Sequence, residues 1–223
     1  MRIDGVRIGA RDVSEAAARY AVLLGTGPEP TAAGRLRFQL ARGVIELEAG
    51  EPGVRSAVFA REPGDPEWPD GAGAYHGLDI RVEASGATAA APHVSTAIDH
   101  VVVFTPDPAR AIALWRDRLG LRLAFDREFP ARGLRLLFFR SGGLTFEFAC
   151  ALPAPADGSA PDRFHGVSYR VADVAAHRAT LLAAGFDVSE VRPGHKTGTQ
   201  VATVRSGTSE VPTLLIEEAP RGG

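Results

Sequence analysis

The sequence predicts an α+β fold assembled from repeated strand–helix–strand–strand–strand modules. Two internal echoes carry this prediction. Residues 3–6 (Ile-Asp-Gly-Val) and 98–101 (Ile-Asp-His-Val) each precede a helical stretch that ends in Leu-Gly, and the offset is 95 residues at both landmarks. A second echo relates residues 75–82 to residues 164–171, because an aromatic-His-Gly sequence opens both. Self-similarity at a fixed offset indicates a duplicated structural unit.

The clearest module begins at residue 98. β-Branched and aromatic residues over 98–104 predict a strand. Asp107-Pro108 then predicts a helix start, because proline is tolerated in the first turn, where its missing N–H has no partner to lose. Apolar residues at three- and four-residue spacing predict an amphipathic helix over 109–119, which Gly120 closes. Turn residues delimit three further strands, over 121–129, 134–140 and 144–149.

The following module repeats this order. A strand over 164–171 leads into a helix over 174–184, and three more strands are expected over 186–191, 200–205 and 213–217.

The N-terminal half is less regular. Residues 1–49 read as a shorter copy of the module, whereas residues 50–97 hold one convincing strand, over 77–82, between Pro- and Gly-rich stretches. We therefore expect a degenerate half over 1–96, made of the module over 1–49, a linker and a strand near 75–83. A complete pair of modules is expected over 97–223.

The composition excludes several classes of function. The formal net charge of −2, without a basic cluster, argues against nucleic acid as a partner. The single cysteine excludes a disulfide framework, and no apolar run reaches the roughly 20 residues that a membrane span needs. The first residues include acidic ones and lack an apolar stretch, so no signal peptide is expected. These features favour a cytoplasmic protein that acts on a small molecule.

The paired modules resemble the vicinal oxygen chelate superfamily, which includes glyoxalase I, bleomycin-resistance proteins, extradiol dioxygenases and related epimerases. The resemblance rests on Ile98-Asp99-His100-Val101-Val102-Val103, on Leu119-Gly120-Leu121, on Leu144-Thr145-Phe146-Glu147-Phe148 and on the ending over 211–217. It covers residues 97–218 well and residues 1–49 moderately. It implies cup-shaped mixed sheets with helices packed outside, and a homodimer.

The resemblance also implies a divalent metal site. His100 and Glu147 match the ligands of the first module, and His165 matches the histidine that opens the second. The fourth ligand position falls near Leu214, although the nearest acids are Glu217 and Glu218. Two imidazoles and a carboxylate suit Zn²⁺, Ni²⁺, Mn²⁺ or Fe²⁺ and leave positions open for substrate oxygens.

Three functions are compatible with this pattern. The first is a metal-dependent lyase or isomerase of the glyoxalase type, which chelates a small oxygenated metabolite through two oxygens, with Glu217 as the catalytic acid or base. Phe139, Tyr169 and His195 are the expected substrate-binding residues. The second is a metal-free binding protein of the bleomycin-resistance kind. The third is an extradiol-type dioxygenase.

The N-terminal half is expected to lack its own site. Gly5 stands where the complete pair has His100, so the equivalent first ligand is missing. Glu46, Glu48 and His76 are interpreted as structural residues.

Overall fold

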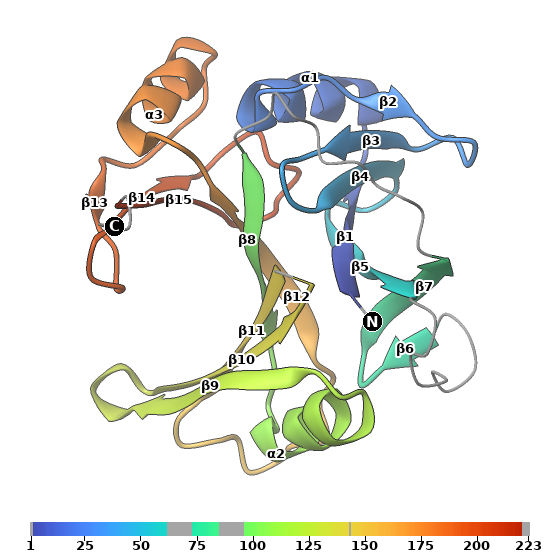
Figure 1. Cartoon of the computed structure of the whole chain (residues 1–223), viewed down its shortest axis with the longest axis vertical. Helices are drawn as coiled ribbons and strands as arrows, with labels where there is room; N and C mark the ends of the chain where they lie inside the picture. The colour runs from blue at the N-terminus through green and yellow to red at the C-terminus, as the bar shows by residue number, and fades with distance from the viewer. Residues whose placement is uncertain (1, 62–72, 85–95, 143, 220–223) are drawn as a thin grey trace.

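The computed structural model describes residues 2–61, 73–84, 96–142 and 144–219. Two mixed sheets, one of seven strands and one of eight, account for about half of this part of the chain. Figure 1 shows them side by side, with helices α1 (Val13–Leu24) and α3 (Val174–Ala183) at one end and α2 (Pro108–Ile112) at the other. The predicted α+β class is confirmed.

The eight-stranded sheet is symmetric in its strand order, which reads β13-β14-β15-β12-β8-β11-β10-β9. The central strands β8 (Ala97–Phe104) and β12 (Arg163–Arg170) are antiparallel. Each first strand has the fourth strand of its own module parallel at its side. A pseudo-twofold axis between β8 and β12 therefore relates the two modules. The other strands are β9 (Arg122–Phe129), β10 (Leu134–Ser141), β11 (Leu144–Ala151), β13 (Arg192–Pro193), β14 (Thr199–Val204) and β15 (Thr213–Glu218).

The seven-stranded sheet follows the same plan with a shortened second module. Its order is β2-β3-β4-β1-β5-β7-β6. The strands are β1 (Arg2–Ala10), β2 (Glu29–Pro30), β3 (Leu36–Gln39), β4 (Val44–Ala49), β5 (Gly53–Arg61), β6 (Gly73–Tyr75) and β7 (Leu78–Ala84).

Strand β5 corrects the interpretation of this half. We expected one strand between residues 50 and 97, equivalent to the strand over 164–171. The structure has β5 antiparallel to β1, as β12 is to β8, so β5 is the first strand of the second module. Strand β7 lies parallel to β5 and occupies the fourth-strand position. The two aromatic-His-Gly sequences therefore belong to strands at different positions in their modules, since β7 is a fourth strand and β12 is a first strand.

The three helices begin in the same way. Asp12, Asp107 and Asp173 each accept a hydrogen bond from a backbone N–H in the first turn, which satisfies one of the donors left free there. Pro108 follows its cap as predicted. The helix expected over 109–119 widens after α2 into a π-helical segment (Ala113–Arg118), and Gly120 closes it with φ 70°.

One predicted strand, over 186–191, is wrong. Within this stretch Val188 makes a single isolated bridge to Val204, and regular pairing starts only at β13. Strand β13 has two residues, which makes it a short edge strand of the kind that limits edge-to-edge pairing.

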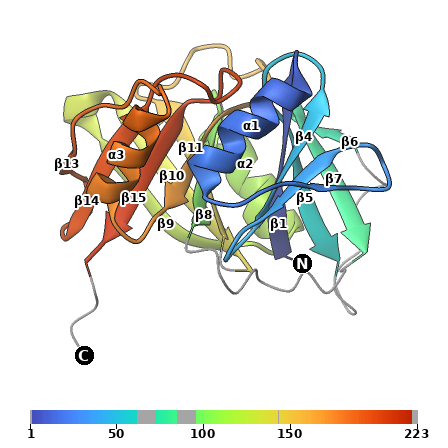
Figure 2. The ribbon, with the colours of Figure 1, turned by 90° about the horizontal axis from the view of Figure 1, so that it is seen from above.

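The two sheets share one hydrophobic core. Phe59 of β5 packs against Trp115 at 6.0 Å and against Phe146 of β11 at 5.6 Å between ring centroids. Helices α1 and α3 lie side by side (Figure 2), and Arg19 of α1 donates to the carbonyl of Ala184 at 2.9 Å. Because apolar and polar contacts both cross between the sheets, the two halves form one packed body. No helix in the described ranges is long and apolar enough to cross a membrane.

Candidate functional site

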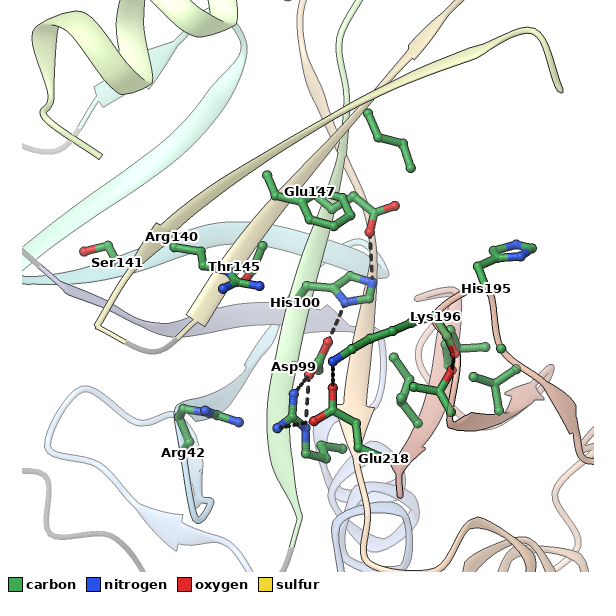
Figure 3. A pocket seen from close by; sticks show the side chains of 18 of the residues that line it. Arg42, Asp99, His100, Arg140, Ser141, Thr145, Glu147, His195, Lys196 and Glu218 are labelled. Carbon is green, nitrogen blue, oxygen red and sulfur yellow. Dashed lines mark hydrogen bonds and ion pairs between the residues drawn. The ribbon is translucent and has the colours of Figure 1, made fainter. Parts of the chain in front are cut away.

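A cavity of about 750 Å³ lies inside the curl of the eight-stranded sheet. All eight strands of that sheet contribute lining residues, so the sheet encloses the cavity as a cup. Arg42, in the turn between β3 and β4, also lines it, so the N-terminal half contributes to the same cavity. Figure 3 shows His100 near its centre, with Glu147, Asp99 and Glu218 around it.

His100 is held by three neighbours at the centre of the cup. Its Nδ1 donates to Asp99 Oδ2 at 2.9 Å, and its Nε2 lies 2.8 Å from Ser168 Oγ and 3.5 Å from Glu147 Oε2. Arg170 holds Asp99 in turn, with its Nε 3.1 Å from Asp99 Oδ1. The imidazole is therefore fixed in orientation, which a group that binds or transfers a proton requires.

A β-bulge explains why neighbouring residues of β8 both face the cavity. His100 pairs with Ser168, but the next pair along is Ile98 with Tyr169, so Asp99 is an extra residue on β8. A bulged residue escapes the usual alternation of faces. Asp99 can therefore reach the ring of His100 from the adjacent position.

The same pairing locates the position in β12 that is equivalent to His100. His100 pairs with Ser168 and Val102 pairs with Gly166, and the helix caps Asp107 and Asp173 lie seven residues after His100 and Gly166, so the pseudo-twofold axis exchanges His100 with Gly166. A Cβ atom at Gly166 would lie 2.3 Å from the carbonyl oxygen of Pro212, so the backbone there leaves no room for a side chain. The second module thus has no histidine at its ligand position.

The fourth ligand position falls at Leu214, as expected. Glu147 lies beside Val102 in the β8–β11 pair, and Leu214 lies beside Ser168 in the β12–β15 pair, so the axis exchanges the two. Leu214 lines the cavity with an apolar side chain. Of the four positions, two carry donor groups.

His165 lies away from this centre. It is the extra residue of a second bulge, between Phe164 and Gly166, and its ring stacks on Phe104 at 4.2 Å. Burial and the charge of Arg163 lower its pKa. The structure therefore does not bring His165 together with His100 and Glu147.

Three other predicted site residues also lie outside the cavity. Glu217 accepts a hydrogen bond from the N–H of Val174 at 2.8 Å and so caps α3. Phe139 and Tyr169 are fully buried in the core. In each case an adjacent residue of the strand lines the cavity instead, since successive residues of a strand face opposite sides: Phe138, Arg170 and Glu218.

His195 does line the cavity, with Lys196 beside it in the loop between β13 and β14. Lys196 pairs with Glu218, and Glu218 is also 3.1 Å from Arg170. The hydrogen bond from Lys196 outweighs burial and lowers the pKa of Glu218. Sequence reasoning missed Ser168 and Arg170, although their period-two spacing with Gly166 was a usable signal.

The N-terminal sheet has closed its equivalent of this site. Glu46 lies beside Arg7 in the β1–β4 pair, as Glu147 lies beside Val102, so Glu46 is the counterpart of Glu147. Arg7, Arg35 and Arg37 all donate to its carboxylate, at 2.9, 2.7 and 2.6 Å. The Glu46 carboxylate is therefore engaged by three guanidinium groups.

The described donors do not fit a metal ion. His100 and Glu147 are adjacent, but within the described ranges no group of three His, Cys, Asp or Glu side chains is placed to hold a cation. Zinc and related ions take at least three protein ligands in the usual sites. Both nitrogens of His100 already have partners within the protein.

We expect His100 to remain protonated above its ordinary range. Burial lowers the pKa of His100, but the Asp99 hydrogen bond and the negative charge of Glu147 outweigh it, so the pKa is raised from 6.5. The interaction of protonated His100 with Asp99 and Glu147 therefore stabilises the fold fully below pH 6.5. This stabilisation is lost as the pH rises through the raised pKa of His100. Imidazole NMR titration of the wild type should give a midpoint above 6.5 for His100, and Asp99→Asn should lower it. His165, whose pKa is lowered, is the internal control; a His100 midpoint below that of His165 would contradict the expectation.

Comparisons with known proteins agree with this geometry. Residues 99–203 match the family model described as the Glyoxalase/Bleomycin resistance protein/Dioxygenase superfamily. The structure is similar to a mutant of 4-hydroxymandelate synthase from Streptomyces coelicolor, with a TM-score of 0.68 and 12% identity over 100% of this chain and 94% of that chain. It is also similar to methylmalonyl-CoA epimerase from Mycobacterium tuberculosis, with a TM-score of 0.45 and 21% identity over 56% of this chain and 89% of that chain. No curated protein sequence matches the chain. The match over residues 99–203 relates this part of the chain to the glyoxalase/bleomycin resistance protein/dioxygenase superfamily, the vicinal oxygen chelate proteins.

Proposed function

We propose that this protein binds a small organic molecule in the cup of its eight-stranded sheet without a metal ion. The observation that supports this most is the combination of an open cavity of about 750 Å³ with Gly166 and Leu214 at two of the four ligand positions. A cavity of this size is typical of small-molecule sites.

The lining suits a molecule with both apolar and polar parts. Leu136, Phe138, Leu214 and Ile216 supply apolar surface, and His100 and Glu147 supply a proton donor and an acceptor at the centre. Few, fixed polar groups among apolar ones orient a ligand and set its specificity. A homodimer, expected from the family resemblance, stays a prediction.

A metal-dependent lyase or isomerase is the second candidate. The observation that favours it is the retention of His100 and Glu147, 3.5 Å apart, at positions where the family resemblance implies ligands. A metal would have to displace Ser168 from His100 and find its remaining ligands elsewhere. An extradiol-type dioxygenase is less favoured, because the last-strand position that should carry glutamate holds Leu214.

Binding of N-phenyl-1-naphthylamine, a neutral fluorescent probe, tests the proposal. We expect saturable one-to-one binding to chelator-treated protein, because no step of the binding requires a metal. Leu214→Trp should abolish it by filling the cavity, whereas Leu182→Trp should not, since Leu182 is 42% exposed on α3. Fluorescence titration measures both. Binding that appears only after Zn²⁺, Ni²⁺, Mn²⁺ or Fe²⁺ is added, and that His100→Ala removes, would support the metal-dependent candidate instead.

A further inference from the structure

We infer that the cavity selects ligands that carry an anionic group, a carboxylate or a phosphate, and holds that group on Arg42, Arg122 and Arg140. This inference rests on the proposed function and deepens it, since it names the class of ligand. All three arginines line the cavity and come from different elements. Their guanidinium groups can each offer two parallel hydrogen bonds to a carboxylate or a phosphate.

Arg122 and Arg140 are both exposed and bring two like charges together at one edge of the cavity. They lie directly opposite each other in the β9–β10 register. Like charges in directly opposed positions destabilise a sheet. Another arginine of β10, Arg135, has a carboxylate partner, with its Nη2 2.8 Å from Asp126 Oδ2. Within the described part of the chain no carboxylate pairs with Arg122 or Arg140.

Arg42 reaches the cavity from the N-terminal half. Its backbone is anchored to the start of β8, because its carbonyl accepts from the N–H of Ile98 at 2.9 Å and the residue bridges to Ala97. Figure 3 shows its side chain extending toward Asp99. The Nε atom is buried and has no hydrogen-bond partner among the described residues. Buried donors are normally satisfied, so this one lacks an acceptor that a ligand would provide.

The other cations near the centre of the cup are already neutralised. Arg170 pairs with Asp99 and Glu218, and Lys196 also pairs with Glu218. Arg192 lines the cavity too, but from β13, at the opposite edge of the sheet from β9. The uncompensated positive charge on the β9–β10 side therefore belongs to Arg122 and Arg140, and Arg42 adds a further charge to the cavity from the N-terminal half.

Register places Arg122 and Arg140 at one end of a row that crosses the sheet. The paired positions run through Arg122, Arg140, Thr145, His100, Ser168 and Leu214. A ligand whose anionic group lies on the arginines would extend past Thr145 toward His100 and Glu147. Its remaining part would contact the apolar side chains of β10 and β15. A single ligand can therefore contact the arginines at one end of the row and Leu214 at the other.

A matched pair of probes tests the inference. 8-Anilinonaphthalene-1-sulfonate is the anionic counterpart of N-phenyl-1-naphthylamine, from which it differs by its sulfonate. We expect tighter binding of the sulfonate probe at low ionic strength. Arg140→Gln and Arg42→Gln should each weaken it by about tenfold, the usual order for a lost charged hydrogen bond, and weaken binding of the neutral probe much less. Arg118→Gln, at an exposed arginine outside the cavity, is the control. Thermal unfolding checks that each variant is folded.

Competition identifies the anion class and separates the possible failures. Inorganic phosphate and malonate should displace the sulfonate probe but not the neutral one, and the stronger competitor shows whether phosphate or carboxylate is preferred. If both probes bind equally and neither arginine variant matters, the anionic subsite is refuted while the binding function stands. If neither probe binds, the proposed function fails and the inference fails with it.

Discussion

Replacing Glu46 with glutamine is expected to lower the free energy of unfolding by about 3–5 kcal/mol, the usual loss when one partner of a buried ion pair is removed. Glu46 is 2% exposed and accepts hydrogen bonds from Arg7, Arg35 and Arg37. Burial raises the pKa of this carboxyl, but the three arginines outweigh burial and lower it. Glutamine keeps the shape and removes the charge, so the buried Arg7 is left with Glu83 as its carboxylate partner among the described residues.

Urea denaturation at neutral pH measures this loss, and Glu48→Gln is the control. Glu48 lies two residues along β4 and is only partly buried. Because the pKa of Glu46 is lowered, its stabilising effect is present above the ordinary value of 4.5 and is lost as the pH falls through the lowered one. The wild type and Glu46→Gln should therefore converge in acid. Equal losses for the two variants at neutral pH would contradict the assignment.

Replacing Trp115 with alanine is expected to cost about 3–5 kcal/mol, as for other buried aromatic residues. Trp115 is fully buried and packs against Phe59 of the N-terminal sheet and against Phe146 and Phe148 of the C-terminal sheet, at 6.0, 5.3 and 5.7 Å between ring centroids. The cavity left behind would loosen both sheets at once. We therefore expect one cooperative transition at a lower urea concentration.

Circular dichroism during urea unfolding measures the effect of Trp115→Ala. Trp115→Phe is the matched variant, and it should cost less, because it keeps an aromatic ring and removes an indole N–H that has no hydrogen-bond partner among the described residues. Two separate transitions, with the N-terminal half unaffected by the alanine variant, would show that the halves fold independently.

The sequence alone predicted the two modules over residues 97–223 and the order of their elements, apart from the strand over 186–191, because hydrophobic periodicity and turn residues are local properties. Asp107-Pro108 marked a helix start, and the strand over 98–104 matches β8 within one residue. The sequence also identified His100 and Glu147 as candidate site residues, since an ionisable residue inside an apolar strand stands out wherever the strand lies. Both line the cavity.

Tertiary structure decided which face of each strand meets the cavity. Alternation tells which residues share a face, but not whether that face is inside the cup, so Glu217 was favoured over Glu218 and Tyr169 over Arg170. The bulge at His165 changes the phase by one residue and puts Gly166 at the ligand position. Arg42 belongs to the other half of the chain, so only the packing of the two sheets could bring it to the site.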